Sequence, residues 1–139
     1  MTTQEIHSMR DKILEGIALS YSRLVESTIK NMDAAIRLRQ ARFNAGGRPE
    51  EVLKLSEENP ITWLERPPAG YMGETAGLDM SKVAMGEWRF DSTSKRLYYR
   101  PRLSKTLSVG GGGDRVLGWH VPTGTNVLPV TPYRWTAPD

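Results

Sequence analysis

The residues of this sequence best suited to acid–base or metal chemistry are two histidines, His7 and His120, and neither has a recognisable metal-ligand spacing around it. No cysteine is present, which excludes thiol catalysis, disulfides and thiolate metal sites. Ser20, Ser22 and Ser27 lie in no Gly-x-Ser-x-Gly motif, so a hydrolase triad has no support. We therefore expect no catalytic residue, no cofactor and no bound metal, and a protein that is not an enzyme.

Five carboxylates in the middle of the chain are candidates for calcium, namely Glu57, Glu58, Glu65, Glu74 and Asp79. They lack the Asp-x-Asp-x-Asp spacing of a calcium loop, so we expect solvated acids.

The glycine run at 110–113 has the composition of a phosphate-binding loop but lacks both the Gly-Lys-Ser/Thr ending and a following helical pattern. It favours a hairpin loop instead.

Basic and aromatic residues alternate at Arg96, Tyr98, Arg100 and Arg102. Such a strip can stack bases and neutralise phosphates of single-stranded nucleic acid, although arginines along an exposed strand also protect a sheet edge. Counted by segment, the net charge is +3 for residues 1–48, −5 for 49–80 and +5 for 81–139. An acidic middle segment argues against one continuous surface for polyanions.

The first third of the chain has the period of a helix. Its apolar series steps by three and four residues and comprises Ile6, Met9, Ile13, Ile17, Tyr21, Leu24, Thr28, Met32 and Ile36. Thr2-x-x-Glu5 predicts a capping box at the start, and Asn44-Ala45-Gly46-Gly47 predicts a left-handed stop. A helix over about residues 3–44 extends roughly 60 Å, twice the diameter of a small domain. We therefore expect its N-terminal half to project.

Residues 46–85 predict a short helix after Pro49 and then an irregular connector, because Pro67-Pro68 forbids a helix or a central strand. From Gly86 the period changes to two, with Trp88 and Phe90 on one face. A turn at 91–95 then predicts a β-hairpin. Strand patterns follow at 116–121 and 127–135, the latter limited by its prolines to an edge.

Together these elements predict a single α+β domain over 1–139: a long helix (1–45), a connector (46–85) and an antiparallel sheet (86–139) packed on the helix. We expect Leu24, Met32 and Ile36 to be buried with the aromatic face of the sheet. No apolar run of about 18 residues exists, so we expect no bilayer span in this sequence.

Three blocks of the sequence carry a resemblance to a known family. They read Asn59-Pro60-x-x-Trp63-Leu64-Glu65-Arg66-Pro67-Pro68-x-x-Tyr71-x-Gly73-Glu74, then Gly86-x-Trp88-x-Phe90-Asp91, then Leu97-x-Tyr99-Arg100-Pro101-Arg102, and the ending over 127–135 is similar as well. With the preceding helix, they resemble the soluble part of a type IV pilin-like protein, either a minor pilin or a type II secretion pseudopilin.

The resemblance implies a non-enzymatic structural subunit of a type IV pilus or pseudopilus, with other pilin or pseudopilin subunits and an inner-membrane assembly platform as partners. It implies a periplasmic or extracellular location, with anchoring through a hydrophobic N-terminal segment. That segment does not appear in this sequence, and we expect a chain shortened at its N-terminus. The candidate assembly residues are then Ile6, Met9, Ile13 and Ile17, and we expect a monomer or weak dimer.

An alternative is a nucleic-acid-binding module, such as a DNA-capturing minor pilin, that uses Arg96, Tyr98, Arg100 and Arg102. The salt dependence of any DNA binding would distinguish the two functions.

Overall fold

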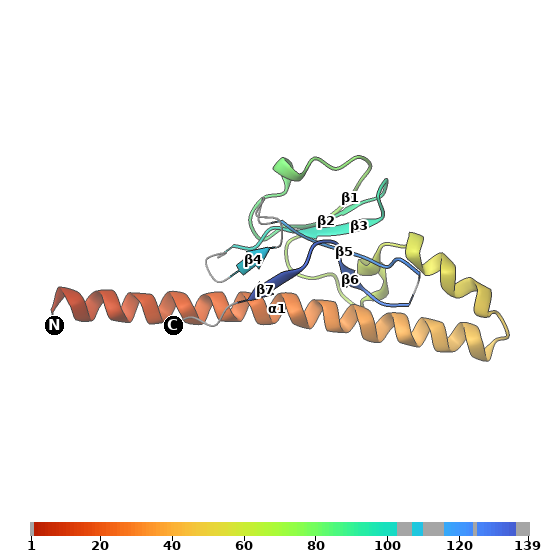
Figure 1. Cartoon of the computed structure of the whole chain (residues 1–139), viewed down its shortest axis with the longest axis horizontal. Helices are drawn as coiled ribbons and strands as arrows, with labels where there is room; N and C mark the ends of the chain where they lie inside the picture. The colour runs from red at the N-terminus through yellow and green to blue at the C-terminus, as the bar shows by residue number, and fades with distance from the viewer. Residues whose placement is uncertain (1, 103–106, 110–115, 124, 136–139) are drawn as a thin grey trace.

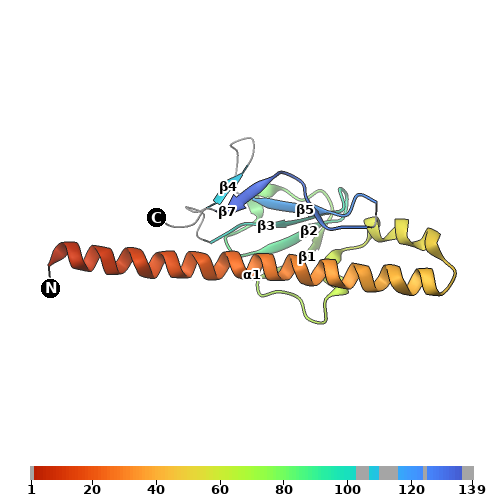
Figure 2. The same cartoon turned by 60° about the horizontal axis from the view of Figure 1, so that its bottom comes forward.

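A computed structural model describes residues 2–102, 107–109, 116–123 and 125–135. For residues 11, 14–19, 21 and 107–109 it describes the backbone alone. The chain combines helices with a five-stranded sheet, so the predicted mixed α+β content is confirmed. In Figure 1 the sheet lies on one side of helix α1 (Thr3–Ala45), over the half of the helix that ends at Ala45. The other half extends beyond the sheet, as Figure 2 also shows.

Both ends of α1 follow from local chemistry. The Thr2 hydroxyl accepts a hydrogen bond from the Glu5 amide at 3.1 Å, and the Glu5 carboxylate accepts one from the Thr2 amide at 3.1 Å. This is the predicted capping box, which satisfies amides that have no partner inside the helix. At the other end Gly47 adopts a left-handed φ of 70°, and the Arg48 amide donates to the Phe43 carbonyl oxygen. Glycine adopts that φ without the strain of a side chain.

The connector contains more regular structure than the sequence predicts. It holds three 3₁₀ helices, η1 (Pro49–Glu57), η2 (Pro60–Trp63) and η3 (Met80–Lys82), and one strand, β1 (Tyr71–Thr75). The prediction of an irregular segment was wrong for β1. Proline excludes a central strand, but β1 follows Pro67-Pro68 and occupies an edge of the sheet.

The main sheet has the order β1-β2-β3-β5-β6. Its centre is the predicted hairpin of β2 (Trp88–Asp91) and β3 (Arg96–Tyr99), which pairs antiparallel with Trp88 opposite Tyr99 and Phe90 opposite Leu97. Strand β5 (Leu117–His120) confirms the pattern predicted at 116–121, and β6 (Leu128–Pro129) lies at the predicted edge.

The described strands within 86–139 pair antiparallel, as predicted. The sheet also takes in β1 from the connector, which was not predicted as a strand and runs parallel to β2. Parallel neighbours need a connection that returns the chain to the starting end of the sheet. Residues 76–87, which include η3, provide that connection. The local alternation of a strand carries no information about the direction of its neighbour, so the sequence pattern did not show it.

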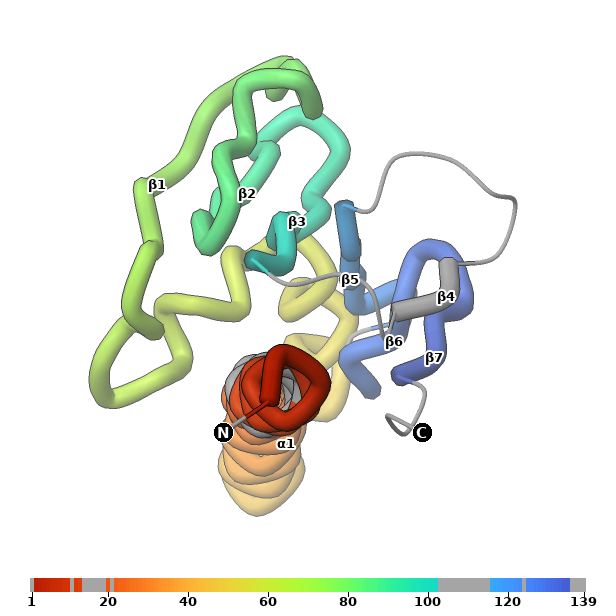
Figure 3. The backbone as a smooth tube through the Cα atoms, turned by 90° about the vertical axis from the view of Figure 1, so that its left-hand side faces the viewer, coloured from red at the N-terminus to blue at the C-terminus, as the bar shows by residue number. Residues whose placement is uncertain are grey.

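The C-terminal part forms a second pair of strands. β4 (Leu107–Val109) pairs antiparallel with β7 (Tyr133–Trp135). The segment predicted as one last strand therefore divides into β6 and β7. The predicted loop at 110–113 lies outside the described residues. Viewed along α1, the strands arch over the helix, with β6 and β7 on one side and the chain leading to β1 on the other (Figure 3).

The core lies between the second half of α1 and the inner face of the sheet. Met32 and Ile36 are fully buried, as are Leu97 and Trp119 in the sheet facing them. The predicted burial of Trp88, Phe90 and Tyr99 is also confirmed. Aromatic rings continue through this layer, with Trp88 4.5 Å from Tyr99 and 5.4 Å from Trp119 between ring centroids.

The predicted burial of Leu24 was wrong, because this side chain is 64% exposed and Val25 is buried in its place. Val25 and Ile29 continue the spacing of Met32 and Ile36, whereas Leu24 lies one residue, or about 100°, away around the helix. Both series have a helical period. The position of the sheet decides which of them is covered.

Candidate functional site

The residues considered for catalysis or metal binding are not brought together. His7 is exposed on α1, His120 is half-buried at the end of β5, and Ser22 is buried on α1 while Ser20 and Ser27 are exposed. Among the residues that the structure describes, no group of three or more His, Asp or Glu is placed to hold a metal ion.

Among the five candidate calcium ligands, Glu58 takes part in the packing of α1 on the connector. Its carboxylate accepts two hydrogen bonds from the Arg39 guanidinium, at 3.0 and 3.1 Å, and one from the Trp63 indole nitrogen at 2.7 Å. A paired, hydrogen-bonded carboxylate of this kind joins two elements. Glu57 and Glu65 are exposed.

The other two carboxylates also accept hydrogen bonds from nearby groups. Glu74 accepts a hydrogen bond from the amide of buried Asn59 at 3.0 Å. Asp79 caps η3, and hydrogen bonds from the Ser81 hydroxyl and then the Ser81 amide hold the pKa of its carboxyl below the usual range. These contacts give all three paired acids structural roles.

The basic strip is divided between surfaces. Arg96 and Tyr98 lie half-buried on β3, and the Tyr98 ring lies against Gly118 of the next strand. Arg100 donates to the backbone carbonyl oxygens of Val83, at 2.5 Å, and Met80, at 3.1 Å. Arg102 instead lines a cavity beside α1. Arg100 therefore fixes the η3 loop, and Arg102 faces a different part of the surface from Tyr98.

The candidate assembly residues lie where the helix leaves the sheet. Ile6, Met9 and Ile13 are exposed by 48%, 52% and 61%, which agrees with their predicted exposure in a monomer. The side chain of Ile17 is outside the described residues. We call Ile6, Met9 and Ile13 the helix stripe. Three exposed apolar side chains on one helical face are typical of an interaction surface.

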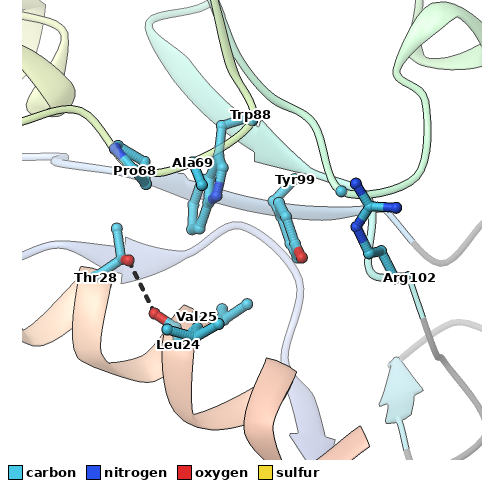
Figure 4. Close-up of a pocket in the computed structure, with 10 residues that line it drawn as sticks. Leu24, Val25, Thr28, Pro68, Ala69, Trp88, Tyr99 and Arg102 are labelled. Carbon is cyan, nitrogen blue, oxygen red and sulfur yellow. Dashed lines mark hydrogen bonds between the residues drawn. The ribbon is translucent and has the colours of Figure 1, made fainter. Parts of the chain in front are cut away.

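A groove runs beside α1 between the helix and the chain from Trp63 to Gly70. It consists of two adjoining cavities of about 240 and 520 Å³ that share Thr28 and Pro68 in their walls. Figure 4 shows the first of them, with Leu24, Val25 and Thr28 on the helix side. We call these two cavities the helix groove.

The far walls of the helix groove are aromatic at one end and polar at the other. Trp88, Tyr99 and Arg102 line the first cavity, and Glu65 and Arg66 contribute to the second. Arg102 lies across Gly86, where a Cβ atom would come within 2.5 Å of its Nε. The absence of a side chain at Gly86 therefore allows Arg102 to lie at the groove mouth.

The opposite flank of α1 is held by the C-terminal strands. Glu26 accepts hydrogen bonds from the Tyr133 hydroxyl at 2.7 Å and the Trp135 indole nitrogen at 3.0 Å, and Asp33 accepts one from the Val127 amide at 2.9 Å. Burial, together with the bond to Glu26, raises the pKa of Tyr133 far above its usual value. This flank was not predicted from the sequence, although Glu26 and Asp33, seven residues apart on the helix, were a visible signal.

Comparisons with protein-family models, curated proteins and solved structures gave no match to this chain. Among the described residues, no helix combines the length and the apolar character required to cross a membrane.

Proposed function

We propose that this chain is a non-enzymatic structural subunit of a type IV pilus or type II secretion pseudopilus that assembles through its N-terminal helix. The observation that carries the proposal is the division of α1 into two parts. From Ser22 onward one face of the helix is buried under the sheet, whereas the described side chains before it are exposed, with the helix stripe among them.

This division is expected of a subunit that folds with one half of a helix and assembles with the other. A helix half without tertiary packing gains little stability from propensity alone, so a role outside the domain accounts for its apolar face. The resemblance of the sequence blocks at 59–74, 86–91 and 97–102 supports the same function. Under this proposal the protein acts on the periplasmic or extracellular side of the inner membrane, with other pilin-like subunits and an assembly platform as partners.

The free energy gained by burying the helix stripe suits a weak contact that is repeated between subunits. Burying three half-exposed apolar side chains contributes roughly 2–4 kcal/mol, which is less than the cost of bringing two free proteins together. The stripe by itself therefore favours the predicted monomer or weak dimer in solution. In a filament, the remaining subunit contacts supply the rest.

The test is the recovery of the protein in filaments sheared from cells that carry its gene. Ile13→Glu places a charge on the helix stripe, and we expect it to remove the protein from the filament fraction. The matched control is Lys12→Glu, because Lys12 is also exposed but lies outside the stripe. Normal recovery of Ile13→Glu at unchanged cellular levels would refute assembly through this surface.

A further inference from the structure

We propose that the helix groove is the receptor for the helix stripe of a second copy of this chain, packed parallel and head to tail. This inference rests on the proposed function and names the surface that receives the helix. Three features of the groove point to this occupant: its angular position on the helix, its register with the stripe, and the charge at its mouth.

The stripe and the helix wall of the groove occupy the same face of α1. Leu24 follows Ile6, and Asn31 follows Ile13, by eighteen residues, which is five turns at about 3.6 residues per turn. Leu24 and Asn31 are both exposed and line the groove. Leu24 and Asn31 lie about 80–120° around the helix from the buried Val25 and Met32, so the sheet leaves their face open.

A shift of eighteen residues along the helix therefore superimposes the helix stripe on the helix wall of the groove. A parallel copy displaced by about 27 Å along the axis brings its Ile6 level with Leu24 and its Ile13 level with Asn31. Its stripe then faces the apolar wall of the first cavity and continues into the second. The groove offers the second helix more apolar contact than a lone helix would, because Pro68 and the ring of Trp88 line it beside α1.

The charge at the groove mouth selects the direction of the second helix. No carboxylate of the described residues forms an ion pair with Arg102. In a parallel copy, Glu5 lies on the flank of the stripe that faces Arg102. Because Glu5 precedes Ile6 by one residue, it lies within one residue of the level of Leu24. An antiparallel copy would bring Arg10, on the other flank, against Arg102. Opposite charges favour the parallel arrangement.

A parallel, displaced contact joins two different surfaces, the stripe of one copy and the groove of the next. Such a contact does not close on itself, and it repeats along an axis. An antiparallel pair would use the same surface twice and stop at a dimer. The number of copies that can be linked therefore distinguishes the two arrangements.

Engineered cysteines test the arrangement directly, because the chain has none of its own. In Ile13→Cys/Asn31→Cys, mild oxidation at high protein concentration is expected to give a ladder of dimers, trimers and longer products that reductant collapses. In the control Ile13→Cys/Arg37→Cys the second cysteine is exposed on another helix face, and only slow, non-specific dimers are expected. A disulfide requires its two Cα atoms within about 7 Å, so the ladder reports the register.

Three results would overturn the inference. The first is an oxidation product no more abundant than in the control. The second is efficient dimer formation by Ile6→Cys/Asn31→Cys, because an antiparallel copy whose Ile13 is level with Leu24 brings its Ile6 level with Asn31. Binding of the monomer to anionic vesicles, with no ladder, would assign the stripe to a lipid surface and would also overturn the inference.

Charge reversal provides an independent test. Arg102→Glu is expected to slow cross-linking about two- to fivefold, the effect of an exposed ion pair. Glu5→Arg in the same chain is expected to restore the rate, which a purely structural loss at either position would not do. If cross-linking fails while Ile13→Glu still removes the protein from filaments, the groove is wrong and the proposed function stands.

Discussion

Replacing isoleucine by alanine at two positions of α1 compares its packed and projecting halves. Ile36 is fully buried against the sheet, whereas Ile13 is 61% exposed beyond it. Removing a buried isoleucine side chain costs about 2–5 kcal/mol, because it loses apolar burial and leaves a cavity. Ile13→Ala is expected to change stability by only a few tenths of a kcal/mol, since alanine is also the better helix former.

The assay is thermal unfolding followed by tryptophan fluorescence, since Trp88 and Trp119 are buried in the same core. For a chain of this length, the loss at Ile36 lowers the thermal midpoint by at least about 6 °C. Both variants carry the same chemical change in the same helix, so each serves as the control for the other. Equal, large losses would show that the N-terminal half of α1 belongs to the core, and the division of the helix would be refuted.

Three further predictions follow from the described contacts. Gly70→Ala should cost more stability than Gly73→Ala in thermal unfolding: both have positive φ, but a Cβ at Gly70 meets a backbone oxygen at 2.0 Å and one at Gly73 meets nothing within 4 Å. Glu26→Gln, which weakens the acceptor for Tyr133, should cost about 1–3 kcal/mol and make the C-terminal strands exchange amide hydrogens faster. Burial alone would raise the pKa of Asp91, but the hydrogen bonds to its carboxylate outweigh burial and lower the pKa. The contribution of Asp91 to stability is therefore present above about pH 4 and is lost as the pH falls through the lowered pKa. Asp91→Asn should remove that part of the acid dependence of the unfolding free energy.

The sequence predicted those features that depend on neighbours along the chain. The capping box at Thr2, the stop near Gly47 and the β2–β3 hairpin each follow from residues a few positions apart, whose backbone geometry fixes which side chains can meet. The alternation that places Trp88 and Phe90 on one face is of the same kind. This alternation is kept in the folded protein because successive side chains of a strand point to opposite faces of the sheet.

Features that depend on residues distant in sequence were not predictable in this way. The parallel pairing of β1 requires the chain to return across residues 76–87, and nothing in Tyr71–Thr75 specifies the direction of its partner. The hydrogen bonds from Tyr133 and Trp135 to Glu26 join segments more than one hundred positions apart. Their geometry exists only after the sheet has packed on the helix.

The face of α1 illustrates the boundary between the two kinds of information. The sequence by itself determined that apolar residues recur with a helical period, and that period admits Leu24 and Val25 equally. Only the tertiary structure decided between them, because the sheet covers about one side of a helix and leaves the adjacent side open. Val25 therefore became core, and Leu24 became the wall of a groove that the chain from Trp63 to Gly70 completes.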